Sequence, residues 1–419
     1  MPHRPIAAMA GVRQGWATLG PVRRLAAFVL VFALLVSALA ALSPPPADSA
    51  AEAFDHFYNL EFDSALRIFR EMARAHPADP QWRNHVAQTI LYREMHRAGA
   101  LETELVTGGN AFLRREKMNP SPADVAEFES AIAASVRLCQ ERLAKDPDDK
   151  WALYYEGVAH GLRANYDFLV RKAWTDALRQ ATESRKLHDR VTALDPDFVD
   201  ARLTQGAHDY IVGSLPWHYR LLGFVVGFRG DKERGIETLR QVRAFGKRNA
   251  DDAAILLATI YRREKRPADA VPILKQLLAK YPRNYLLGFE LAQMYSDLGQ
   301  KDAALAAVAE VERRKRDGTP GYASLSQEKI LYFRATIQFW YRDFDHALEN
   351  FLAVTGKASD LDPNTGVTAW MRLGQTYDMK GRRAEAIAAY RKAVAYAPGS
   401  YRAKEAEDYI RKPYTRVKS

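Results

Sequence analysis

Cysteine is almost absent from this sequence of 419 residues. Cys139 is the only one, so the chain cannot form an intramolecular disulfide, and a site built from several thiolates is excluded. No two of the ten histidines form a pair at metal-binding helical spacing with a glutamate. The fold must therefore be stabilised by packing, and the sequence predicts neither a metal site nor a cofactor.

Motifs that carry catalysis are also missing. The sequence has no Gly-x-Ser-x-Gly nucleophile turn, and no glycine-rich phosphate loop follows a predicted strand. The nearest glycine-rich segment, residues 227–235, lacks the lysine and hydroxyl ending of a phosphate loop and instead predicts a turn that opens a helix. His160 and His208 each follow a glycine on a predicted first helix, and we expect structural roles for both. The sequence therefore predicts no catalytic residue.

The N-terminal segment has the order of an export signal. Four arginines and no acidic residue precede the uncharged residues 25–36, and the small residues of a cleavage site follow at 38–40. Residues 1–40 are predicted to be a cleaved signal peptide or, because the uncharged run extends to Leu42, an uncleaved membrane anchor. Either alternative places the rest of the chain in the periplasm or at the periplasmic face of the inner membrane.

The composition suits a water-soluble protein built of amphipathic helices, with 47% hydrophobic and 27% charged residues. The net charge falls by four, from +10 to +6, when the N-terminal arginines are left out. Basic clusters at residues 262–266 and 313–316 are expected at helix C-termini, where they meet the negative end of the helix dipole. Nucleic-acid binding would need an intracellular location and a continuous basic face, so no nucleic-acid partner is predicted.

A unit of 34 residues repeats in the C-terminal third. Small residues at unit positions 8, 20 and 27 let two antiparallel helices approach, large residues fill the gaps between them, and a proline at position 32 ends the second helix. The clearest copy has Trp370, Leu373, Gly374, Tyr377, Ala386, Tyr390, Ala393 and Pro398 at these positions. Further copies run from Leu257 to Pro282, from Leu291 to Val311 and from Leu331 to Val354.

The N-terminal half carries the same pattern in a degenerate form. First helices are predicted at residues 82–92, 151–162 and 202–211, each followed by a second helix. Gly206 occupies position 8 of its unit, and Gly235 supplies position 20 only after a long insertion. The predicted parts of the chain are a Pro-rich linker at 41–50, a divergent helical array at 51–245, regular repeats with a capping helix at 246–411, and a basic tail at 412–419.

Residues 51–411 resemble the tetratricopeptide-repeat superfamily, strongly in the last third and loosely before it. The resemblance implies an all-α solenoid of antiparallel helix pairs, in which the first helices line a concave surface that binds peptides or partner proteins. It also implies a scaffold or adaptor and not an enzyme. Residues 211–236, with their two glycine-containing stretches, are similar to a segment of the eukaryotic tetratricopeptide-39 family, which indicates common architecture.

The concave positions of the regular units mix apolar, aromatic and polar side chains. Our candidate partner-binding residues are Phe289, Gln293, Tyr332, Phe339, Trp340, Met371 and Gln375. No regular unit has asparagine at position 9, so the carboxylate clamp of chaperone-binding relatives is not predicted. The expected partners are proteins or peptides, and the sequence leaves the oligomeric state open.

The apolar segment at residues 216–228 is too short to span a membrane. It is either a buried insertion that covers the concave surface or an exposed patch for a partner or a membrane surface. The leading hypothesis is a protein-binding scaffold in the bacterial cell envelope. The alternative is a peripheral membrane organiser that uses residues 216–228 together with the basic surface.

Overall fold

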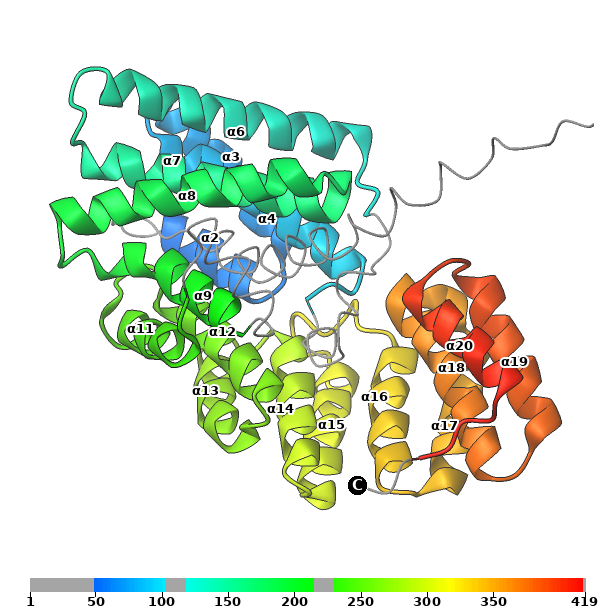
Figure 1. Cartoon of the computed structure of the whole chain (residues 1–419). Coiled ribbons are helices and arrows are strands. Elements are labelled where there is room, and N and C mark those ends of the chain that lie inside the picture. The colour runs from blue at the N-terminus through cyan, green and yellow to red at the C-terminus, as the bar shows by residue number, and fades with distance from the viewer. Residues whose placement is uncertain (1–48, 102–117, 215–229, 417–419) are drawn as a thin grey trace, which may run out of the picture.

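The computed structural model describes residues 49–101, 118–214 and 230–416, and within these ranges the chain forms helices and no strand. The helices follow one another as antiparallel pairs, and each pair packs on the next to form a curved array (Figure 1). The pairs are α2 (Ser49–Tyr58) with α3 (Phe62–Ala75), α4 (Pro80–Arg97) with α6 (Pro122–Leu143), α7 (Lys150–Tyr166) with α8 (Trp174–Leu194), α9 (Arg202–Gly213) with α11 (Lys232–Phe245), α12 (Ala250–Arg263) with α13 (Pro267–Lys280), α14 (Tyr285–Asp297) with α15 (Lys301–Arg316), α16 (Gln327–Trp340) with α17 (Phe344–Gly356), and α18 (Pro363–Met379) with α19 (Arg383–Tyr396). The predicted all-α solenoid is confirmed.

Three short helical segments lie between these helices. A π-helical segment, η2 (Asp167–Arg171), follows α7, and 3-10 turns, η3 (Val199–Ala201) and η4 (Ala358–Asp360), precede α9 and α18. After the last pair comes α20 (Tyr401–Arg411), which packs on α19 and α18 and buries Ala403 and Ala406. It lies at the end of the 246–411 region, where the capping helix was predicted.

Polar N-cap residues precede most of the first helices. Asp79, Asp149, Asn284, Ser326 and Asp362 each accept an N–H bond from the first turn of α4, α7, α14, α16 and α18. Such a bond satisfies a donor that has no partner inside the helix. The caps explain why these helices begin where they do, although the repeat pattern itself says nothing about their first residue.

The turn inside the repeat has the same backbone in divergent and regular units. The second residue after the first helix has a positive φ in the α2, α12, α14, α16 and α18 pairs. These residues are Leu60, Lys265, Gly299, Arg342 and Gly381, with φ between 56° and 77°. The turn of the first unit therefore shares this left-handed residue with the turn of the last, despite the weak sequence signal of the first unit.

Close approach at the small positions is confirmed for the unit interrupted by the long insertion. A Cβ atom built on Gly235 of α11 would lie 2.4 Å from the backbone nitrogen of Tyr210 and 2.5 Å from the carbonyl oxygen of Gly206. Positions 8 and 20 of this unit thus meet as predicted. The insertion itself, including residues 216–228, lies outside the described residues, as do residues 1–48, which hold the predicted export segment.

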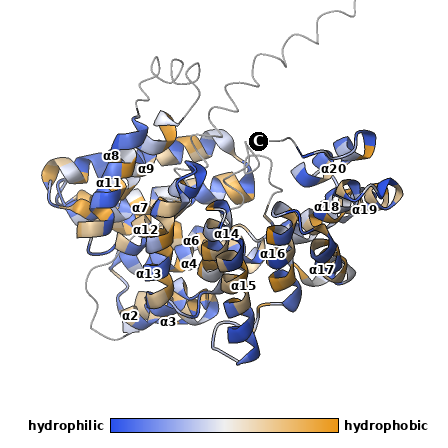
Figure 2. Ribbon diagram, turned by 90° about the horizontal axis from the view of Figure 1, so that it is seen from below, coloured by the Kyte–Doolittle hydropathy of each residue, from blue (hydrophilic) through white to orange (hydrophobic). Residues whose placement is uncertain are grey.

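Hydrophobic and hydrophilic residues alternate along the helices (Figure 2), and most of the buried side chains are hydrophobic. Three clusters of buried residues follow the chain, from Ala50 to Ala201, from Leu203 to Met294 and from Tyr285 to Ala406. The middle cluster joins α9 and α11 to the regular repeats that follow. In the part of the chain that the structure describes, no helix is both long and apolar enough to cross a membrane.

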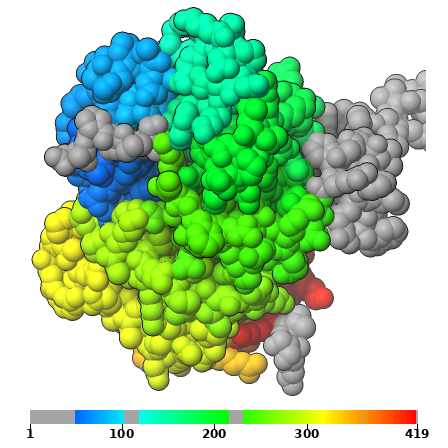
Figure 3. Space-filling model, turned by 90° about the vertical axis from the view of Figure 1, so that its left-hand side faces the viewer, coloured from blue at the N-terminus to red at the C-terminus, as the bar shows by residue number. Residues whose placement is uncertain are grey.

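The first pair also packs on the middle of the array. Arg283, in the turn before α14, donates to Asp55 at 2.5 Å and to Glu61 at 2.7 Å. The Asn284 amide donates to the carbonyl oxygen of Tyr58 at 2.7 Å. In the space-filling view the blue N-terminal helices meet the yellow-green middle repeats (Figure 3). We call these contacts between α2–α3 and α12–α14 the closure contact.

The centre of the closure contact is buried. The Tyr58 hydroxyl donates to Asp252 of α12 at 2.5 Å, and the Tyr58 ring stacks on Tyr281 with centroids 4.8 Å apart. Burial raises the pKa of Asp252 to about 8, and the neighbouring carboxylates Asp251 and Asp200 add to the effect. A buried carboxyl group is thus held between segments separated by 194 residues.

Candidate functional site

The seven predicted contact residues lie on the first helices α14, α16 and α18, and six of the seven are buried. Trp340 is the exception, with 36% of its surface exposed; the buried ones are Phe289, Gln293, Tyr332, Phe339, Met371 and Gln375. The burial has local causes, since Phe289 stacks on Phe333 of the next unit with centroids 4.0 Å apart. Their part in binding stays a prediction, and the buried six offer little surface to a partner.

Several of the predicted residues meet where α16 ends beside α18. The guanidinium of Arg372 lies 4.9 Å from the ring centroid of Trp340 and 5.4 Å from that of Phe339. It donates to the side-chain oxygen of Gln375 at 2.8 Å. Arg372 is 7% exposed, and its Nε has no hydrogen-bond partner. Arg372 is not among the candidate residues from the sequence, because its unit position, next to that of Met371, is not one predicted to be concave.

Residues Lys412–Arg416, which we call the tail, pack on this same region. In Figure 1 the tail, drawn in red, runs from α20 back towards α16. The Tyr414 N–H donates to Asp378 at 2.8 Å, and the Tyr414 ring lies 5.3 Å from Tyr409 and 6.0 Å from Phe339. The tail-binding surface consists of Phe339, Trp340, Arg372, Asp378 and Tyr409.

Arg416 makes the second contact of the tail. Its guanidinium lies 5.2 Å from the Trp340 ring centroid and donates to the Trp340 carbonyl oxygen at 2.8 Å. Trp340 therefore has two arginines against its ring, one from α18 and one from the tail. The sequence predicted a basic tail at 412–419. In the structure residues 412–416 pack against the body, and residues 417–419 lie outside the described residues.

Asp378, at the C-terminal end of α18, fixes where the tail crosses. Its carboxylate is 1% exposed and accepts from Arg383, from the Tyr390 hydroxyl and from the Tyr414 backbone. Burial, followed by the hydrogen bond to Asp378, raises the pKa of Tyr390, so this hydroxyl remains a donor. Arg383 also donates to the carbonyl oxygens of Tyr409 and Ile410 at 2.8 Å and thereby holds the end of α20.

This arrangement can recognise an extended chain. It offers a buried acceptor for a backbone N–H, an aromatic contact between Phe339 and Tyr409, and an aromatic face for a cation at Trp340. Aromatic rings and buried charge-assisted hydrogen bonds are the features that dominate binding energy in protein interfaces.

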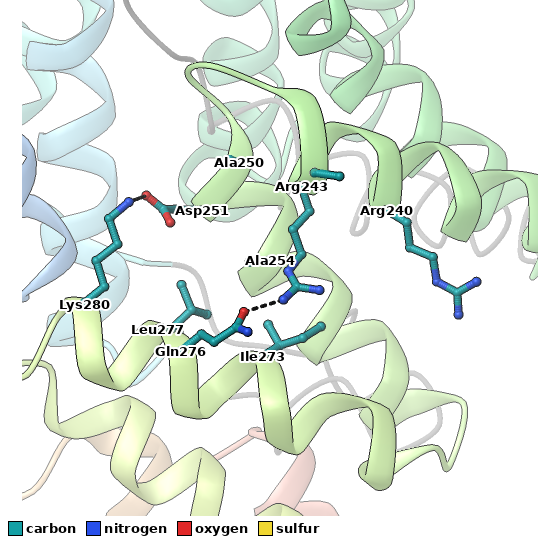
Figure 4. Close-up of a pocket in the computed structure, with 10 residues that line it drawn as sticks. Arg240, Arg243, Ala250, Asp251, Ala254, Ile273, Gln276, Leu277 and Lys280 are labelled. Atoms are coloured by element: carbon teal, nitrogen blue, oxygen red, sulfur yellow. Dashed lines mark hydrogen bonds and ion pairs between the residues drawn. The ribbon is translucent and has the colours of Figure 1, made fainter.

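A concavity with a volume of about 460 Å³ is lined by α11, α12 and α13 (Figure 4). Its rim is basic, but the cations have partners within the protein. Arg243 donates to Gln276 at 2.5 Å, and Lys280 donates to Asp251 at 2.6 Å. The floor is formed by Ala254, Ile273 and Leu277. None of the seven predicted residues lines it.

His160 and His208, for which the sequence predicts structural roles, occupy separate sites. His160 bonds to Gln180 at 2.5 Å, and His208 contacts Arg185. Burial raises the pKa of the Cys139 thiol, which makes this group unreactive. In the residues that the structure describes, no group of three or more His, Cys, Asp or Glu side chains is arranged to hold a metal ion.

Two segments match sequence models of one family. Residues 261–328 and residues 367–400 each match a model described as tetratricopeptide repeat. Both segments lie in the regular part of the array. No curated protein sequence matches the chain, and the similarity of residues 211–236 to a tetratricopeptide-39 segment stays a prediction.

The chain is also similar to solved structures of low sequence identity. The crystal structure of yeast Tom70 is 13% identical with a TM-score of 0.38, covering 87% of this chain and 94% of that one. The human IFIT1 dimer with m7Gppp-AAAA is 13% identical with a TM-score of 0.42, covering 93% and 87%. The P58(IPK) TPR domain is 18% identical with a TM-score of 0.21, covering 68% and 85%.

Proposed function

We propose that this chain is a non-enzymatic adaptor that holds an extended partner segment on the tail-binding surface. The tetratricopeptide-repeat matches over residues 261–328 and 367–400 support the proposal, because such repeats in general serve protein-protein interaction. We further propose that it does so in the bacterial cell envelope. The order of charges and apolar residues at the N-terminus supports this location.

The choice of the tail-binding surface rests on one observation. Trp340 is a large aromatic residue, 36% exposed, at a unit position predicted to be concave, and Arg372 beside it is buried with an unpartnered Nε. Tryptophan and arginine are the residue types most enriched among those that dominate interface energies. The tail contacts at the same place support an affinity of this surface for extended chain.

The test is affinity capture with the Trp340→Ala variant. Removing the ring deletes the aromatic face offered to the partner. A dominant interface residue typically contributes roughly 2 kcal/mol to the binding free energy, so we expect capture of partner proteins from envelope extract to fall at least tenfold. Capture from envelope and from cytosolic extract is measured side by side by quantitative mass spectrometry. We expect the partner to come from the envelope.

The matched control is Phe245→Ala. Phe245 is an aromatic residue at the end of α11 with 70% of its surface exposed, far from the tail in the sequence. Its removal should leave capture unchanged. Equal capture by the wild type and the Trp340→Ala variant would contradict the proposed surface, and a partner enriched only from cytosol would contradict the proposed location.

A further inference from the structure

We propose that the tail mimics the partner and occupies its binding site. We propose further that the partner is an extended segment with an aromatic residue followed two positions later by an arginine. The proposal rests on the proposed function and adds to it the chemistry of the partner and a competition within the chain. The tail would compete with the partner for Trp340, Phe339 and Asp378.

The tail contacts the body with alternate residues. Tyr414 and Arg416 are half-buried, whereas Lys412, Pro413 and Thr415 are exposed. Lys412 leaves α20 in an extended conformation, with φ −132° and ψ 124°. In an extended chain, successive side chains point to opposite sides. The surface therefore contacts the side chains at positions i and i+2 of an extended chain, and the side chain between them can vary.

Each contact of the tail can be made by a separate peptide. Asp378 accepts a main-chain N–H, which every residue except proline supplies. Tyr409 meets the Tyr414 ring edge-on, with an interplanar angle of 89°, a favourable geometry for any aromatic residue. Trp340 offers a ring face and a carbonyl oxygen to a guanidinium. A lysine can use the ring but lacks the planar fork, so arginine fits better.

The tail is suited to being displaced. It has no side chain among the fully buried residues, and Trp340 stays partly exposed beneath it. Because the tail is joined to α20, its effective concentration at the surface is high, on the order of millimolar. A partner in solution must overcome this competitor, so removal of the two tail anchors should strengthen binding in trans.

The experiment uses the full chain and a fluorescein-labelled peptide with the sequence of residues 412–419. The wild type is compared with a Tyr414→Ala/Arg416→Ala variant by fluorescence anisotropy. We expect the variant to bind the peptide at least tenfold more tightly than the wild type. Adding Trp340→Ala to the variant should abolish this gain, and a peptide with the same two alanine replacements should bind neither protein.

Equal peptide binding by the wild type and the double variant would overturn the proposal, as would absence of binding to both. So would a gain that the alanine peptide shares, because the aromatic and arginine pattern would then play no part. The proposed function fails on a different result, namely capture that is insensitive to Trp340→Ala. Loss of capture in that variant together with equal peptide binding leaves the proposed function standing and removes only this inference.

Discussion

Asp252 is a carboxyl group enclosed in the closure contact, and it makes stability depend on pH. Burial raises its pKa to about 8, compared with about 3.9 in an unfolded chain. Between about pH 4 and about pH 8 the folded chain therefore retains a proton that the unfolded chain releases. By linkage, this group's contribution is fully favourable below pH 4 and is lost as the pH rises towards 8.

Replacing Asp252 with Asn keeps the acceptor for the Tyr58 hydroxyl and removes the titration. We expect Asp252→Asn to be more stable than the wild type by a margin that grows from pH 5 to pH 8, reaching about 2 kcal/mol or more. Urea unfolding at the two pH values measures it. Asp408 is exposed on α20, so Asp408→Asn should change the free energy of unfolding by the same small amount at both pH values. A margin for Asp252→Asn that does not change with pH would refute the expectation.

At the scale of helices, close packing of small residues fixes how α9 and α11 pair. A methyl group on Gly235 would meet backbone atoms of Gly206 and Tyr210, which cannot rotate away. We expect Gly235→Ala to lower the free energy of unfolding by about 2 kcal/mol. A methyl group on Gly356, the last residue of α17, would have no neighbour within 4 Å, so Gly356→Ala should be neutral or slightly stabilising. Thermal denaturation compares them, and similar losses in both variants would contradict the packing argument.

The repeat pattern allowed the helices to be predicted because it is local. The 34-residue spacing located the C-terminal pairs, and the glycines at positions 8 and 20 carried the register across the insertion between α9 and α11. The burial of six candidate site residues could not be predicted. Whether such a side chain is covered depends on which residues of the next unit and of the tail pack against it, as Phe333 packs on Phe289 and Tyr414 on Phe339. The aromatic Tyr414 and Arg416 were the available signal for a packed tail.

At the scale of the whole molecule, the closure contact joins segments that no periodic pattern relates. Arg283 pairs with Asp55 and Glu61, and Tyr58 reaches Asp252, across more than 190 residues. A nearest-neighbour repeat pattern contains no information about such contacts. The sequence therefore predicted the solenoid and missed the contact that limits its extension.

Breaking the closure contact should loosen the array without unfolding its helices. In an Arg283→Ala/Tyr58→Phe variant the charged hydrogen bonds to Asp55 and Glu61 and the buried hydroxyl are lost, so we expect the free energy of unfolding to fall by about 2 kcal/mol or more. We also expect the radius of gyration from small-angle X-ray scattering to increase while far-UV circular dichroism stays constant.

Arg313→Ala is the control for that experiment. Arg313 also has two acidic partners, Glu310 and Asp317, but both lie within a turn of it, at the end of α15. Its loss should change neither the scattering profile nor, by more than a few tenths of a kcal/mol, the stability. An unchanged radius of gyration in the Arg283→Ala/Tyr58→Phe variant would show that neighbour packing alone sets the curvature.

The closure contact also bears on how this architecture can evolve. An open solenoid tolerates duplication or deletion of a unit, because each unit touches only its neighbours. Here the pairs between α2 and α12 must bring Tyr58 to Asp252. Adding or removing one pair in that stretch would displace the two residues by a whole unit, so their number is fixed by geometry. Change in repeat number is then confined to the C-terminal side, the part of the array that carries the tail-binding surface.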